Sequence, residues 1–129
     1  MTLLRRVLKT QAALWAIVGL ACLAVPGAVA SALGADPTDD ALLRLLGVAV
    51  VVLAMTMVLV SQHLLETWWW AWAFALLEAG VATVCVLRAL TAPAGTPTAA
   101  WWVAGVASIA FGALDLLGLA RAEQAKPFA

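Results

Sequence analysis

The stretch WWWAWAFALLEAGVATVCVLRAL, residues 68–90, decides the fold class of this chain. A helix needs about 20 predominantly apolar residues to cross the hydrocarbon core of a bilayer, and this stretch is long enough. Its only charged residues are Glu78 and Arg88, and tryptophan fills four of its first five positions. The stretch therefore predicts a membrane-spanning helix with an aromatic end and one carboxylate inside it.

The composition of the whole chain extends this prediction. Of its 129 residues, 66% are hydrophobic and only 11% are charged, with a mean hydropathy of +1.07. A soluble domain is about half apolar and a quarter charged, so these few charges are too sparse to cover a soluble surface. The 7 basic and 7 acidic residues cancel, and no basic patch suits nucleic acid. We predict an integral membrane protein that contacts the lipid bilayer and binds no nucleic acid.

Three further apolar stretches have the length of a membrane span. They cover residues 12–33, 41–61 and 99–120, and short segments with Gly and Pro separate several of the spans. No connecting segment is long enough to fold by itself. The sequence thus predicts one membrane domain over residues 1–129, an all-α bundle of four transmembrane helices.

The positions of lysine and arginine predict the orientation. Arg5, Arg6 and Lys9 precede the first span, while Arg121 and Lys126 follow the fourth. Cytoplasmic segments carry the excess of Lys and Arg, and four spans return the chain to the side where it started. Both termini are therefore predicted to be cytoplasmic, in a cell (plasma or inner) membrane. The Ala-rich composition without Tyr or Asn suggests a bacterial source.

The first span also has features of a secretory signal. Basic residues precede an apolar run, and Ala28-Val29-Ala30 resembles a cleavage site. The run is longer than the apolar core of a signal, so a retained helix is the favoured interpretation and a cleaved signal is the alternative. Pro26-Gly27 predicts a kink near the end of this helix.

The opposite side of the membrane carries a few charges near helix ends. Residues 36–39 have the pattern of a helix start, with an Asp cap followed by Pro. Asp40 and Arg44 are four residues apart, so they are expected to pair along the first turn. Arg88 lies near the end of the third span. We interpret Asp40, Arg44 and Arg88 as interface charges rather than as a ligand site.

The tryptophans gather at predicted span ends. They are Trp15 in the first span, Trp68, Trp69, Trp70 and Trp72 in the third, and Trp101 and Trp102 in the fourth. An indole combines a large apolar body with one N–H donor and therefore suits the headgroup boundary. The pattern predicts an aromatic belt, and a ligand-stacking site is the alternative.

Glu78 is the most informative single residue. It belongs to a stripe of small residues at helical spacing: Ala71, Ala75, Glu78, Ala82, Cys85 and Ala89. A second, bulky stripe contains Trp70, Phe74, Leu77, Val81 and Val84. Small residues let another helix approach closely, whereas bulky residues suit lipid. Glu78 is therefore expected to face the interior of the bundle.

Asp115 follows the same logic in the fourth span. It comes after Ala104, Ser108 and Gly112, which share one helix face. An ionised carboxylate at mid-membrane costs at least about 2.5 kcal/mol, so these acids should be protonated, paired or hydrogen-bonded. The sequence leaves three roles open for Glu78: an interhelical hydrogen bond, a proton or cation site, or a contact with a partner protein.

No known catalytic motif is present in the sequence. There is no nucleophile elbow, no phosphate-binding loop, and no haem or zinc pattern, and His63 and Glu66 have no evident third ligand. The expectation is a protein that is not an enzyme, with no catalytic residues, no metal site and no cofactor.

The layout resembles that of small bacterial four-helix membrane proteins of the DoxX-like type. The resemblance lies in the Arg-led first helix, the loop containing Gly34, the Arg44-Leu45-Leu46-Gly47 start of the second span, and small residues along every span. It implies a four-helix bundle and little about activity, although some relatives are accessory subunits of redox enzymes.

Two functional hypotheses follow from the sequence. The leading one is a structural or accessory membrane protein that acts through helix packing, in a homo-oligomer or with a membrane protein partner. The alternative is a small transporter or channel-like protein in which Glu78 and Asp115 handle protons or a cation.

Overall fold

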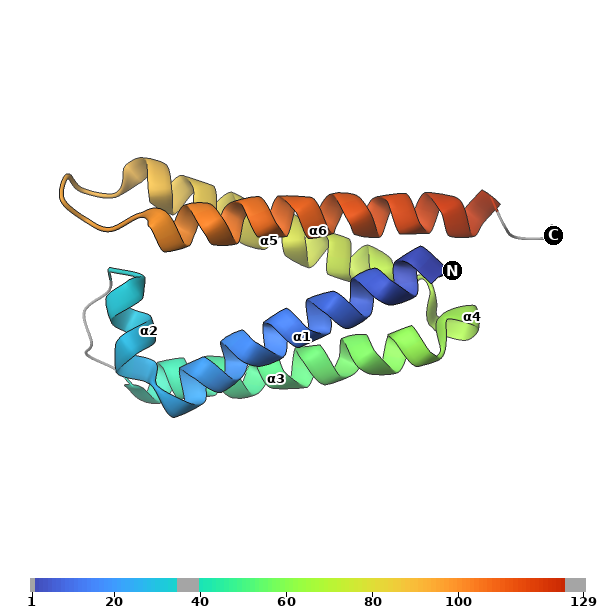
Figure 1. The fold of residues 1–129 in the computed structure, drawn as a ribbon, viewed down its shortest axis with the longest axis horizontal. Coiled ribbons are helices and arrows are strands. Elements are labelled where there is room, and N and C mark those ends of the chain that lie inside the picture. The colour runs from blue at the N-terminus through green and yellow to red at the C-terminus, as the bar shows by residue number, and fades with distance from the viewer. Residues whose placement is uncertain (1, 35–39, 125–129) are drawn as a thin grey trace.

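The computed structural model describes residues 2–34 and 40–124, and its regular structure there is entirely helical. The helices are α1 (Thr2–Ala24), α2 (Pro26–Ala32), α3 (Asp40–Gln62), α4 (Leu64–Thr67), α5 (Trp70–Thr91) and α6 (Ala99–Gln124). In this part of the chain, α1, α3, α5 and α6 are long and apolar enough to cross a membrane. The chain is thus a multi-pass membrane protein with four candidate spans (Figure 1).

The first span differs from its predicted bounds. α1 begins at Thr2 rather than at residue 12, because Lys and Arg are good helix formers and continue the apolar helix without a break. Val25, with φ −134° and ψ 60°, separates α1 from α2. A residue before proline avoids the helical region, and Pro26 then occupies the first turn of α2. The predicted kink at Pro26-Gly27 is confirmed as a break between two helices.

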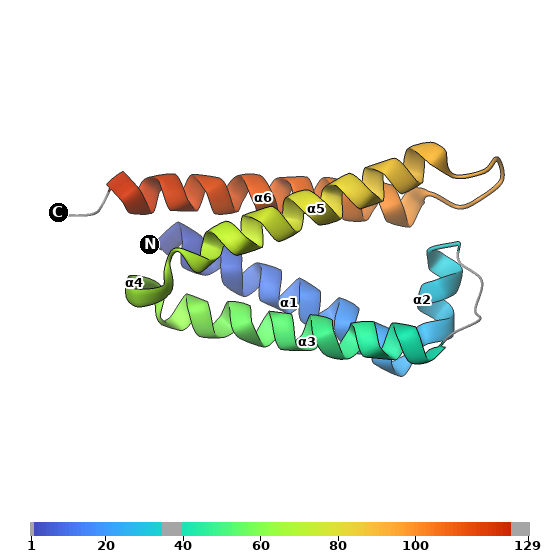
Figure 2. The same cartoon turned by 180° about the vertical axis from the view of Figure 1, so that it is seen from behind.

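The helices form two hairpins. α1 packs along α3, α5 packs along α6, and contacts between α1 and α6 join the two pairs (Figures 1 and 2). α1 begins and α6 ends at the same end of the molecule, which we call the terminal end. The hairpins lie close together there and further apart at the opposite end, where α2 extends between them.

The apolar core lies toward the terminal end. Its largest fully buried apolar side chains are Leu4, Leu8, Met57, Leu64 and Leu119. Phe74 belongs to the same cluster and is only 3% exposed, so its predicted place on a lipid-facing stripe is wrong. The prediction requires α5 to pack through its small-residue face alone. Phe74 instead belongs to a core cluster that contains residues of both hairpins.

Large apolar side chains also cover the outside of the bundle. Leu65, Leu76 and Val103 are each at least 70% exposed. Exposing so much apolar surface to water would be unfavourable, whereas contact with lipid tails carries no such penalty. The outer surface therefore suits contact with a bilayer.

Two glycines set the distance between α1 and α3. A Cβ added to Gly47 would lie 2.7 Å from the carbonyl oxygen of Gly19, and one added to Gly19 would lie 2.9 Å from that of Gly47. These positions would clash with backbone, which cannot rotate away as a side chain does. The first hairpin therefore depends on a direct backbone approach at this crossing.

We predict that Gly47→Ala lowers the free energy of unfolding by about 1–3 kcal/mol, the usual cost of overpacking. Gly80→Ala is the matched control, because nothing lies within 4 Å of a Cβ added there. The control should leave stability unchanged or slightly raised. Thermal unfolding in detergent measures both variants, and equal midpoints for Gly47→Ala and wild type would contradict the prediction.

Candidate functional site

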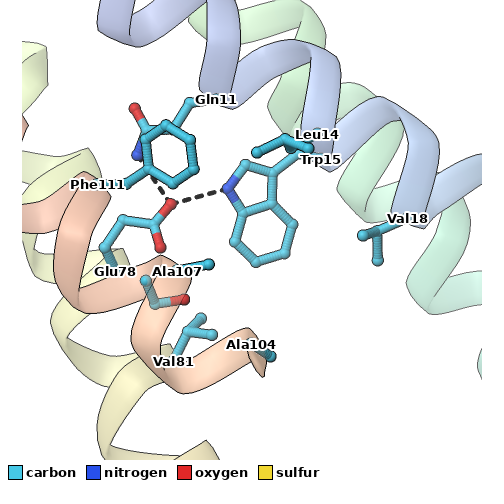
Figure 3. Close-up of a pocket in the computed structure, with 10 residues that line it drawn as sticks. Gln11, Leu14, Trp15, Val18, Glu78, Val81, Ala104, Ala107 and Phe111 are labelled. Atoms are coloured by element: carbon cyan, nitrogen blue, oxygen red, sulfur yellow. Dashed lines mark hydrogen bonds between the residues drawn. The ribbon is translucent and has the colours of Figure 1, made fainter. Parts of the chain in front are cut away.

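Glu78 lies inside the bundle on α5. It is 1% exposed, so the prediction that it faces the interior is confirmed. Two donors from α1 reach the same oxygen: Gln11 Nε2 lies 2.8 Å and Trp15 Nε1 lies 2.9 Å from Glu78 Oε1 (Figure 3). Glu78 thus joins α5 to α1 through two hydrogen bonds.

Asp115 on α6 belongs to the same network. It is 0% exposed, and Gln11 Nε2 donates to its Oδ2 at 3.0 Å. The carboxamide of Gln11, itself 0% exposed, therefore bridges Glu78 and Asp115. Sequence left open whether the two acids meet, because the answer depends on how the helices are arranged. The structure brings both acids to one side chain.

Local helix geometry places these groups. Gln11 and Trp15 are four residues apart, so they lie on one face of α1. On α6, Gly112 stands one turn before Asp115 and opposite Glu78: an added Cβ would contact the Glu78 Cβ at 3.5 Å. The small residue lets α6 approach α5 closely, as its small-residue face predicted.

The network is short of hydrogen-bond donors. Gln11 supplies both of its Nε2 protons and Trp15 supplies one, whereas two carboxylates offer about eight lone-pair sites. Gln11 Oε1 and Asp115 Oδ1 are buried and have no hydrogen-bond partner among residues 2–34 and 40–124. All three donated hydrogen bonds come from neutral groups. A proton or another cation would supply the missing positive charge.

A cavity of about 200 Å³ adjoins Glu78. It is lined by Gln11, Leu14, Trp15, Val18, Glu78, Val81, Ala104, Ala107, Ser108 and Phe111, from α1, α5 and α6 (Figure 3). Most of the lining is apolar. The cavity therefore combines one buried carboxylate with a hydrophobic and partly aromatic wall.

The predicted interface charges do not join this site. Asp40 and Arg44 are exposed at the start of α3, and Arg88 is half-buried near the end of α5. No ion pair between Asp40 and Arg44 is among the contacts of residues 2–34 and 40–124, and their pairing stays a prediction. The predicted cap at residues 36–39 lies outside the described residues. Within the same ranges, no group of three His, Cys, Asp or Glu side chains has a metal-binding arrangement.

Sequence reasoning missed Gln11 and the role of Trp15. The predicted span began at residue 12, so Gln11 fell just outside it. Trp15 was assigned to the aromatic belt, but its indole N–H donates to Glu78. The available signal was a carboxamide and a tryptophan one helical turn apart on the same face. Trp101 also has an internal partner, because its Nε1 donates to the Leu33 carbonyl oxygen at 2.9 Å.

The fold and the site define a class: a small four-span membrane protein with two buried acids bridged by one carboxamide. Comparisons of the chain with protein-family models, curated proteins and solved structures give no match.

Proposed function

We propose that the protein is a small transporter or channel-like protein in which Glu78 and Asp115 handle protons or a cation. The observation that carries this proposal is the donor shortage at the acid pair. In the part of the chain that the structure describes, three hydrogen bonds from neutral donors serve two buried carboxyl groups, and two buried oxygens of the network have no partner. Two ionised acids in that state would be strongly disfavoured in a membrane interior.

A bound cation or proton removes this penalty. Protonation would neutralise one acid and create an O–H donor, while a cation would balance the charge directly. Both acids lie at the contact between the two hairpins, and Glu78 also lines a cavity. Such a site is favourable only with a bound proton or cation, and it lies beside a cavity. These features suit the exchange of a proton or cation better than a permanent structural link between helices.

Reconstitution into liposomes tests this proposal. We expect the wild type to dissipate an imposed pH gradient, measured with an internal pH-sensitive dye while potassium and valinomycin clamp the membrane potential. Glu78→Gln should remove this flux because the amide cannot exchange a proton near neutral pH. Glu66→Gln is the control, since it makes the same chemical change at an exposed residue of α4.

Two outcomes would contradict the proposal. One is wild-type flux no greater than that of empty liposomes, with or without an added amine in the external buffer. The other is equal flux from wild type and Glu78→Gln, which would place the proton path elsewhere.

We also propose that the terminal end faces the cytoplasm, because Arg5, Arg6 and Lys9 lie there. Cysteine substitutions at Ala94 in the α5–α6 loop and at Gln62 at the end of α3 test this placement, since both residues are exposed. An impermeant maleimide applied to intact cells should label Ala94→Cys and not Gln62→Cys. The reverse pattern would overturn the orientation.

A second candidate function, an accessory protein, has one supporting observation. An apolar groove between α3 and α5 is lined by Ala49, Val52, Leu53, Thr56, Trp70, Ala73, Phe74 and Leu77. A helix from a second copy or from a membrane protein partner would fit such a groove by close packing. The DoxX-like resemblance favours the same role. Native mass spectrometry after gentle extraction would reveal a defined complex, and a monomer without partners would argue against it.

A further inference from the structure

We infer that the cavity beside Glu78 binds a small hydrophobic ammonium cation. This inference rests on the proposed cation handling and names the class of cation. It is carried by the juxtaposition of a buried carboxylate with an apolar, aromatic wall.

The volume of the cavity fits one small ring with a short arm. An apolar protein cavity of about 150 Å³ is large enough to hold benzene. The cavity here has about 200 Å³, and side chains such as Leu14, Val18, Val81 and Phe111 surround it. A hydrocarbon body is therefore accommodated with room for a short amine-bearing chain.

The carboxylate supplies an acceptor for the charged end. Both donors from α1 converge on Glu78 Oε1, and no residue within the described ranges donates to Oε2. Figure 3 shows this second oxygen turned away from both donors. An ammonium N–H bonded to Oε2 would form a charge-assisted hydrogen bond. The aromatic faces of Trp15 and Phe111 on the cavity wall would add attraction for the cation.

An inorganic cation fits this cavity less well. Mg²⁺ and Ca²⁺ require six or more oxygen ligands, and an alkali ion must also replace much of its hydration shell. The polar side chains of the lining are limited to Gln11, Glu78 and Ser108, with the indole N–H of Trp15. An organic ammonium needs only one or a few acceptors, and the apolar side chains that line the cavity would contact part of its hydrocarbon surface.

The test uses N,N-dimethylbenzylammonium, which has one ring and one N–H donor. Isothermal titration calorimetry with the protein in lipid nanodiscs, near neutral pH, should show saturable binding to one site. Empty nanodiscs correct for partition of the amine into lipid. Glu78→Gln should weaken binding by about tenfold or more, since the charge-assisted bond is lost. Glu66→Gln should bind as the wild type does.

A second variant tests the cavity without touching the acids. Ala104 lines the cavity and is only partly buried, so Ala104→Phe should fill the space and leave Gln11, Glu78 and Asp115 in place. This variant should lose amine binding while it stays folded, as size-exclusion chromatography and circular dichroism report. Wild-type affinity in Ala104→Phe, or wild-type binding no stronger than that of empty nanodiscs, would overturn the inference.

The outcomes separate this inference from the proposed function. Glu78-dependent proton flux without saturable amine binding would overturn the ammonium site and leave proton handling in place. Saturable, Glu78-dependent binding without any proton or amine flux would support the ammonium site and contradict the transport proposal.

Discussion

Gln11→Leu is expected to lower the free energy of unfolding by about 3 kcal/mol, because it removes both donors that bridge the acids. Gln11 Nε2 donates to Glu78 Oε1 and to Asp115 Oδ2, and both acids are buried side chains. After the substitution, Glu78 would keep only the Trp15 indole, and Asp115 would lose its hydrogen bond from α1. The contact between the two hairpins should therefore weaken.

Gln62→Leu provides the matched control for this experiment. It makes the same change at an exposed glutamine at the end of α3. Thermal or SDS-induced unfolding in detergent should show a clearly lower midpoint for Gln11→Leu and little change for Gln62→Leu. Equal midpoints for the two variants would mean that the bridge contributes nothing to stability.

The second large effect is expected when the whole network is replaced by apolar residues. The triple variant Gln11→Leu, Glu78→Leu, Asp115→Ala should fold with a midpoint at or above that of the wild type. Replacing all members of a buried polar network with apolar groups is often neutral or stabilising, whereas breaking it at one member is costly. The same variant should show no proton flux in liposomes, because both titratable groups of the site are gone.

This combination separates a structural network from a functional one. A folded triple variant without proton flux would show that the acids are dispensable for folding and needed for flux, whereas a triple variant that misfolds in detergent would contradict the expected stability. Size-exclusion chromatography and circular dichroism report the folded state before flux is measured. A folded triple variant with wild-type flux would contradict the proposed function.

The sequence predicts the spans well because hydropathy is a sum over many residues. Three of the four spans lie within a few residues of their predicted bounds, and the interior position of Glu78 follows from the small residues around it. The predicted start of the first span at residue 12 is wrong, because the basic residues before it continue the helix instead of flanking it. Gln11 therefore lies outside the predicted span and is not part of the predicted site.

The sequence alone does not predict that Glu78 and Asp115 share the hydrogen-bond donor Gln11. Helix periodicity gives the face that a residue occupies but not which helix lies opposite that face. The same limit explains why the hydrogen bond of Trp15 is not predicted. A tryptophan near a span end looks the same in the sequence whether its indole lies at the headgroup boundary or donates to a buried acid. The prediction that Phe74 faces lipid is wrong for a related reason, because its core cluster contains residues of the other hairpin as well as of its own.

The position of the acid pair between the two hairpins has a mechanical consequence. Each hairpin is packed along its own length, and Gln11 belongs to one hairpin while Glu78 and Asp115 belong to the other. A small tilt of one hairpin against the other would stretch the hydrogen bonds of Gln11 without disturbing the Gly19–Gly47 crossing. A change in the charge state of the acids is therefore expected to shift the preferred angle between the hairpins, and a change in that angle is expected to shift the charge state.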